Sequence, residues 1–277
     1  MTAKKPDEIA REAVKAGDAK AHTSWDKTLL SAFLAGAYIS FGALVAIVVS
    51  SGLDPEIWGT LPTLFTGIAF TLGLVLVLLA GSSLLTGNML LVPISAMGGR
   101  VPLRDVARNL GLVLIGNVVG ALLVAFFLAT ETGVIGTATS PEGSQALMTY
   151  ERLAGIAEQK GLDESAYQIF LRAVGANWLV CLAVWISLGA EQVSGKILAM
   201  FFPIMAFVAM GFDHVVANMF FLPAAMFAGV PGLGWDDVLR NWSLALVGNL
   251  FGAVVFVASS YWYLYLRDEP QDASKAG

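Results

Sequence analysis

The chain has 277 residues, a formal net charge of −5 and a single cysteine. Hydrophobic residues make up 57% of it, charged residues make up 13%, and the mean hydropathy is +0.73. These values indicate a membrane protein. One cysteine excludes an intrachain disulfide, and with a net negative charge we expect no nucleic-acid partner.

Six apolar stretches are long enough to cross a hydrocarbon core of ~30 Å, which takes ~20 helical residues. They run continuously rather than alternating, which favours helices over a closed barrel. The sequence therefore predicts an all-α membrane domain over residues 28–267, with an N-terminal segment (1–27) and a C-terminal tail (268–277) on the cytoplasmic side. The expected spans are Leu29–Ser51, Leu61–Leu85, Leu110–Ala129, Ala166–Leu188, Ile197–Val230 and Leu239–Leu266.

The distribution of charge predicts the orientation. Lys and Arg are frequent in residues 1–27, and Arg100, Arg104 and Arg108 lie between the second and third expected spans. The first short loop on the opposite face contains Asp54 and Glu56 and no Lys or Arg. By the positive-inside rule, both termini are expected in the cytoplasm. The expected location of the protein is the inner membrane.

Two halves of the sequence resemble each other. Residues 108–121 contain Arg-Asn followed by Gly-Asn-Val-Val-Gly-Ala, and residues 240–253 contain Arg-Asn followed at the same spacing by Gly-Asn-Leu-Phe-Gly-Ala. Residues 87–93 likewise match residues 217–223. A duplicated unit with an odd number of spans places its second copy upside down. We therefore predict two inverted three-helix repeats, an arrangement that puts solute sites near the bilayer midplane.

The second and fifth apolar stretches are interrupted by glycine and polar residues, at Gly-Ser-Ser-Leu-Leu-Thr-Gly-Asn (81–88) and Gly-Phe-Asp-His-Val-Val-Ala-Asn (211–218). Non-helical backbone at membrane depth survives only inside protein or along a cavity. The half-helix that restarts after each break has a partially positive amino end. Two such ends directed at each other favour an anionic solute.

His214 is the only histidine within an expected span. A charged group there costs at least ~2.5–3.5 kcal/mol, which favours a functional role over a neutral imidazole filling a polar gap. Thr86 occupies the matching break and can donate to an anion or to an imidazole, or else cap a helix. Asp213 is expected to cap the restarting half-helix or to pair with His214.

Asparagines recur at equivalent positions of the two halves. An asparagine can bridge exposed backbone at a helix break or donate to a solute. We expect the bridging role for Asn88 and Asn218, and both roles remain open for Asn117 and Asn249.

The motifs of an enzyme are absent from the sequence. It has no His-Glu-x-x-His, no nucleophile elbow and no phosphate-binding loop before a lysine. A single histidine in the spans provides no metal site. We expect a protein that is not an enzyme and that needs no cofactor or metal.

Two strings closely resemble signatures of the formate–nitrite transporter family: Ala-Asn-Trp-Leu-Val-Cys-Leu-Ala-Val-Trp (176–185) and Gly-Phe-Asp-His-Val-Val-Ala-Asn-Met-Phe (211–220). The resemblance extends from about Thr28 to Arg267. It implies six-helix, aquaporin-like protomers assembled as homopentamers, with one pore per protomer. The solutes implied are small monovalent anions of weak acids, namely formate, nitrite, hydrosulfide, acetate or lactate.

The resemblance also implies roles for particular residues. The central pair would be Thr86 and His214, and Asn177 and Asn249 would line the path. Leu85 stands where a phenylalanine is common, and Asp213 where a glutamate is common. The cytoplasmic constriction would consist of Leu74, Leu84 and Leu85, and the outer one of Phe70, Phe207 and Val180.

The family's vestibule lysine corresponds to Lys160 after a shift of one residue. Glu158, Asp163 and Glu164 surround it, so this mouth of the pore is more acidic than expected for a funnel that gathers anions. A lysine directed into the funnel above the outer constriction would support anion selection, whereas a carboxylate in its place would change the expected substrate class.

The predicted function is passive or proton-coupled passage of a small weak-acid anion. Two apolar rings would bar a bare anion, because dehydrating a charge is costly, but a weak acid can take up a proton and cross neutral. One alternative is an aquaporin-like pore for a neutral or cationic solute such as ammonia or ammonium, although the Asn-Pro-Ala boxes are missing and His214 would be unexplained. The other is a membrane scaffold that transports nothing.

Overall fold

The computed structural model describes residues 3–268, and every element in that range is helical. Five helical segments are long and apolar enough to cross a membrane: Trp25–Ser50, Leu61–Leu79, Leu103–Thr130, Ala166–Gly189 and Trp235–Tyr265. Three shorter apolar helices are Leu85–Met97, Val193–Ala209 and Val215–Phe227. Except for its first residue, the tail expected over residues 268–277 lies outside the described residues.

The elements follow one another with short connections. The first half contains α1 (Pro6–Ala21), α2 (Trp25–Ser50), α3 (Pro55–Trp58), α4 (Leu61–Leu79), α5 (Leu85–Met97), α6 (Leu103–Leu123) and the π-helical η1 (Val124–Thr130). The second half contains α7 (Gln145–Glu158), η2 (Gln159–Asp163), α8 (Ala166–Gly189), α9 (Val193–Ala209), α10 (Val215–Phe227), α11 (Trp235–Phe251), η3 (Gly252–Ser259) and α12 (Ser260–Tyr265).

Several helices begin earlier than the apolar stretches do. The first expected span starts at Leu29, but α2 starts at Trp25, and α6 starts at Leu103 rather than Leu110. Hydropathy marks where a helix becomes apolar, whereas the first turn is polar and can extend into the interface. The hydrophilic segments also contain helices: α1 lies within residues 1–27 and α7 within residues 130–168.

The repeated glycines allow pairs of long helices to approach closely. A Cβ atom added at Gly120 of α6 would lie 2.0 Å from the carbonyl oxygen of Phe33 in α2. At the equivalent Gly252, it would lie 2.4 Å from the carbonyl oxygen of Val174 in α8. Both distances are too short for any side chain. The Gly-Asn-x-x-Gly strings therefore specify the α2–α6 contact in one half and the contact of α8 with α11 and η3 in the other.

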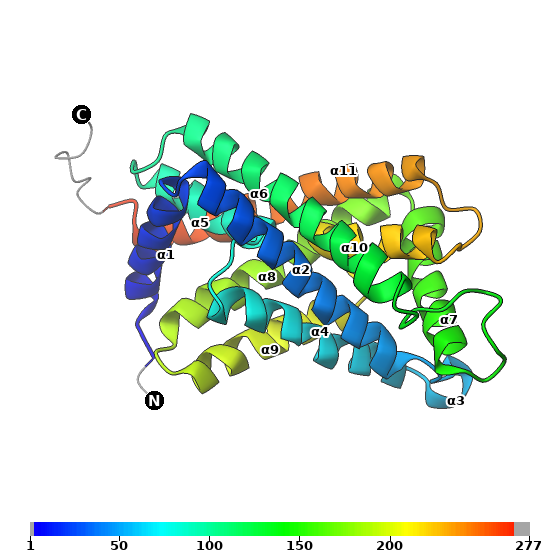
Figure 1. The fold of residues 1–277 in the computed structure, drawn as a ribbon. Helices are drawn as coiled ribbons and strands as arrows, with labels where there is room; N and C mark the ends of the chain where they lie inside the picture. Colours follow the sequence, from blue (N-terminus) through cyan, green and yellow to red (C-terminus); the bar gives the residue numbers. More distant parts are fainter. Residues whose placement is uncertain (1–2, 269–277) are drawn as a thin grey trace.

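The long helices run between two ends of the molecule (Figure 1), with α1 at one end and α3 and α7 at the other. Helix α1 packs on α5 and also contacts α12, so the first and last described helices meet at the same end. Between the ends, α4 packs against α9, and α9 against α8. In the connection from α4 to α5, Gly81 is exposed and Leu84 is buried; in that from α9 to α10, Met210 is exposed and Asp213 and His214 are buried.

Candidate substrate pathway

Two breaks in the helices lie at equivalent places in the two halves. The first break lies between α4 and α5, and the second between α9 and α10. Each contains a glycine at positive φ, with φ of 79° at Gly81 and 69° at Gly211, a conformation that glycine adopts without strain. Helices α5 and α10 then restart with almost completely buried residues.

Thr86 and His214, here called the central pair, join the amino ends of α5 and α10. Thr86 Oγ1 lies 2.8 Å from His214 Nε2, and both residues are buried. The backbone N–H of Ala217 donates to His214 Nδ1 at 3.1 Å, so Nδ1 carries no proton. In the neutral ring, the proton is then on Nε2, which donates to Thr86. Thr86 then accepts from the histidine through its hydroxyl oxygen, and its own hydroxyl hydrogen is not used in this contact.

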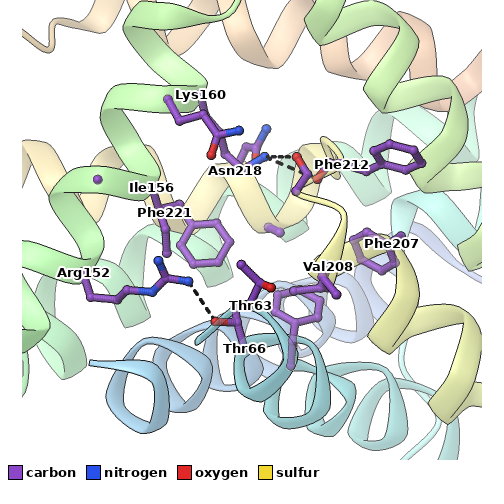
Figure 2. Close-up of a pocket in the computed structure, with 16 residues that line it drawn as sticks. Thr63, Thr66, Arg152, Ile156, Lys160, Phe207, Val208, Phe212, Asn218 and Phe221 are labelled. Carbon is purple, nitrogen blue, oxygen red and sulfur yellow. Dashed lines mark hydrogen bonds between the residues drawn. The ribbon is translucent and has the colours of Figure 1, made fainter. Parts of the chain in front are cut away.

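A cavity that is partly open to solvent lies at the α7 end of the molecule. We call it the α7 cavity; α4, α7, α9, α10 and the second break line it (Figure 2). Phe70 and Phe207 are among its lining residues and meet edge to face, with ring centroids 5.9 Å apart. The Phe207 ring also lies 5.8 Å from the His214 ring. Phe207 therefore lines the cavity and also lies beside the central pair.

Lys160 lines the α7 cavity, but its charge is balanced. Its Nζ donates to Asp213 Oδ1 at 3.0 Å and to the carbonyl oxygens of Gly211 and Phe212, both at 3.3 Å. These contacts use all three ammonium hydrogens, and the side chain is only 8% exposed. Asp213 therefore pairs with Lys160, and the residue that caps α10 is His214.

Glu164 is not among the lining residues of the cavity. Its carboxylate forms an ion pair with Arg172, and its backbone carbonyl accepts from Arg240 at 2.9 Å. Burial, together with the nearby Asp213 carboxyl, raises the pKa of Glu164 to about 7 against the opposing charges of Lys160 and Arg172. The second carboxyl oxygen of each acid lacks a hydrogen-bond partner within the described chain.

This geometry can be compared with known proteins. A model of the family described as "Formate/nitrite transporter" matches residues 7–263. The chain belongs to the formate/nitrite transporter family. It is 43% identical over 269 residues to the uncharacterized transporter YrhG of Bacillus subtilis (strain 168), covering 97% of this chain and 96% of the relative. It is 40% identical over 267 residues to the formate channel BtFdhC of Bacillus thuringiensis, covering 96% and 98%.

Among solved structures, a "pentameric formate channel with formate bound" superposes with a TM-score of 0.74 at 27% identity. The match covers 87% of this chain and 98% of the other. This transporter therefore has the all-helical fold of the family and is a multi-pass membrane protein.

In this family member, Asn249 holds the second break together. Its Oδ1 accepts from the backbone N–H of Val215 at 2.8 Å. Its Nδ2 donates to the carbonyl oxygens of Ala173 and Asp213, both at 2.8 Å. The side-chain amide thus pairs with backbone groups that the helix break leaves open, and both amide hydrogens are used.

Asn117 does the same at the first break. Its Oδ1 accepts from the N–H of Leu85 at 2.9 Å, and its Nδ2 donates to the carbonyl oxygens of Ala32 and Ser83 at 2.7 and 3.1 Å. Asn177, in α8, donates to the Asn249 carbonyl oxygen at 2.8 Å and lies 3.4 Å from the carbonyl oxygen of Thr86.

A second set of hydrogen bonds is also duplicated. The Asn88 amide donates to Asn109, which donates in turn to the Lys20 carbonyl oxygen, at 2.8 and 2.9 Å. The equivalent bonds in the other half run from Asn218 to Asn241 and on to Lys160, at 2.8 and 3.0 Å. Lys20 thus corresponds to Lys160. The Nζ of Lys20 donates to Ser83 at 3.3 Å, whereas the Nζ of Lys160 donates to Asp213. Burial lowers the pKa of Lys20 to about 8.

The remaining residues expected at constrictions are all buried. Leu84 is the N-cap of α5 and Leu85 is its first residue, while Leu74 lies on α4 and Val180 on α8. Within the described range, no group of three or more His, Cys, Asp or Glu side chains could hold a metal ion.

Sequence reasoning missed Arg152 in the α7 cavity, Arg172 beside Glu164, and the pairing of Lys20 with Ser83. Arg152 precedes Lys160 by eight residues, a spacing at which helical residues share a broad face, so this signal was available. The Lys20 contact had no comparable signal, because it depends on how α1 packs against the first break.

Proposed function

We propose that each protomer passes small monovalent anions of weak acids, such as formate or nitrite, across the membrane. The observation that carries the proposal is the central pair: a threonine hydroxyl and a histidine join two helix amino ends, directly behind the aromatic floor of a cavity. Helix amino ends favour negative charge. Relatives that are formate channels support the same class of solute.

The proposed mechanism uses the apolar residues as a filter. Phe70 and Phe207 would form the outer constriction with Val180, and the inner one would consist of Leu74, Leu84 and Leu85. A bare anion loses hydration at each ring, which is costly, whereas the protonated acid does not. The anion gathered in the cavity takes up a proton from water and crosses both rings as the neutral acid. Thr86 donates a hydrogen bond to it between the rings, and the acid returns its proton to water on the other side.

In the proposed architecture, six spans form two inverted repeats. Helices α4 and α5 together make the second span, and α9 and α10 make the fifth. The support is the set of matched bonds, in which Asn117 and Asn249 hold equivalent backbone groups and Lys20 and Lys160 occupy equivalent positions. Protomers assemble as homopentamers in the inner membrane with both termini in the cytoplasm, and no catalysis is involved.

Asn177 and Asn249 are assigned to the pathway in a positioning role. The Asn249 amide is fully engaged with backbone groups, and Asn177 donates to the Asn249 carbonyl. They keep the two breaks in place around the central pair, and the hydroxyl of Thr86 is the donor that meets the solute.

The proposal is tested by uptake into proteoliposomes across a panel of solutes: formate, nitrite, acetate, lactate, glycerol and methylammonium. We expect rapid uptake of the smaller anions and little uptake of glycerol or methylammonium. Thr86→Val keeps the shape of the side chain but removes the donor and should reduce anion uptake. Uptake of glycerol or methylammonium without uptake of anions would contradict the proposal and favour a pore for neutral or cationic solutes.

A further inference from the structure

Of the charged side chains that line the α7 cavity, one is paired with a carboxylate and the other is not. Two charged side chains, Arg152 and Lys160, are among its lining residues. Lys160 has a carboxylate partner in Asp213, and all three of its hydrogens are used. Arg152 has no ion pair to a carboxylate anywhere in the described part of the chain. The net positive charge at the cavity wall therefore comes from Arg152.

Two hydroxyl groups from neighbouring helices hold the Arg152 side chain. Its Nε donates to Ser50 Oγ in α2, and its Nη2 donates to Thr66 Oγ1 in α4, both at 3.0 Å. Ser50 and Thr66 each donate their own hydrogen to a backbone carbonyl oxygen, at 2.7 Å in both cases. They can therefore only accept from Arg152, and as neutral groups they fix its position without cancelling its charge.

The guanidinium keeps donors available for a ligand. It has about five N–H donors, of which two are used by Ser50 and Thr66, so about three remain. Burial lowers the pKa of Arg152, but arginine stays protonated in proteins. A planar guanidinium with free N–H groups matches the two oxygens of a carboxylate or of nitrite.

Arg152 is also well placed along the pathway. Figure 2 shows it entering the cavity from α7, beside Thr66 and below Lys160. Thr66 lies one helical turn from Phe70 on α4, so the guanidinium is held near the aromatic pair at the cavity floor. An anion bound there would be at the outer constriction before it loses its hydration.

We propose that Arg152 is the anion-binding residue of the α7 cavity, where it takes up a small oxyanion such as formate or nitrite, and that Lys160 serves to hold the second break. This inference rests on the proposed function and adds the residue that selects anions. It also explains why carboxylates near Lys160 do not reverse the selectivity. Asp213 and Glu164 are paired with Lys160 and Arg172, and Glu158 and Asp163 are exposed and are not among the residues that line the cavity.

The test measures initial rates of formate uptake in proteoliposomes at low and high ionic strength, for the wild type, Arg152→Gln, Arg152→Lys and Glu151→Gln. Arg152→Gln removes the charge, and Arg152→Lys retains it. Glu151→Gln changes an exposed charge on the same helix and is the matched control. We expect Arg152→Gln to raise the apparent KM for formate about fivefold or more at low salt, the factor for two unit charges ~4 Å apart in water.

Added salt should raise the KM of the wild type toward that of Arg152→Gln, because screening weakens the same attraction. Arg152→Lys keeps the charge but loses the planar fork, so it should recover the salt-dependent part of the loss and not all of it. Glu151→Gln should stay within about twofold of the wild type. A merely structural role would not produce this salt dependence or rescue by lysine. Equal KM values for the wild type and Arg152→Gln at low salt would overturn the inference.

A binding measurement separates failure of this inference from failure of the proposed function. Formate should raise the apparent melting temperature of the solubilised wild type, and much less that of Arg152→Gln, because a ligand that binds the native state stabilises it. If the wild type transports no anion yet formate stabilises it and not Arg152→Gln, the proposed function fails and the binding site stands. If formate stabilises both proteins equally, the inference fails.

Discussion

Replacing Asn249 by alanine should destabilise the transporter severely. The substitution removes three hydrogen bonds of 2.8 Å that close the second break, and all of them lie inside the protein. The Val215 N–H would lose its partner, which costs about 1–3 kcal/mol for a buried donor. Two carbonyl oxygens would each lose a bond with a net value of about 0.5–1.5 kcal/mol. We predict a loss of about 2–6 kcal/mol in the free energy of unfolding.

The assay is chemical denaturation in detergent micelles, followed by tryptophan fluorescence. Leu250→Ala is the matched control, because Leu250 follows Asn249 on α11 and is 38% exposed. The control should change the free energy of unfolding by less than about 1 kcal/mol. If Asn249→Ala is as stable as the control, the amide does not hold the break. A direct contact with the solute would then become the better explanation for this asparagine.

Three further predictions test other parts of the account. His214→Asn should alter the rate or the pH dependence of anion uptake, because it removes the imidazole that contacts the Thr86 hydroxyl. Unchanged uptake would show that His214 has only a structural role. Glu164 has a folded-state pKa of about 7, above its ordinary 4.5, so its contribution to stability is complete below about pH 4.5 and is lost as the pH rises through 7. The melting temperature of the wild type should therefore fall more steeply than that of Glu164→Gln over this range, and parallel profiles would refute the shift. Gly120→Ala should lower the melting temperature because its Cβ would lie 2.0 Å from a carbonyl oxygen, whereas Gly111→Ala, with open space around it, should not.

The sequence predicts the all-helical membrane protein well because this depends on local composition. The apolar stretches identify the long helices, and the glycines at 81 and 211 adopt the positive φ that ends a helix. The membership of the formate/nitrite transporter family was also predicted correctly from residues 176–185 and 211–220. Helix starts were less accurate, since polar first turns carry no apolar signal.

The asparagines show what composition cannot determine. Their equivalent positions indicated a shared role, but whether Asn249 faces a solute or the backbone depends on the exact approach of α11 to the break. The acidic surroundings of Lys160 posed a similar problem. Only tertiary contacts reveal that Asp213 neutralises the lysine and that Arg172 binds Glu164, leaving Arg152 as the unpaired charge of the α7 cavity.

The central claim is that an anion crosses the apolar constrictions together with a proton. The most direct measurement is simultaneous recording of formate uptake and internal pH in proteoliposomes that contain a pH-sensitive dye. The account predicts that formate entry acidifies the interior with about one proton per anion, and that an inward proton gradient accelerates entry. Formate entry that leaves the internal pH unchanged, at a rate independent of the proton gradient, would contradict it.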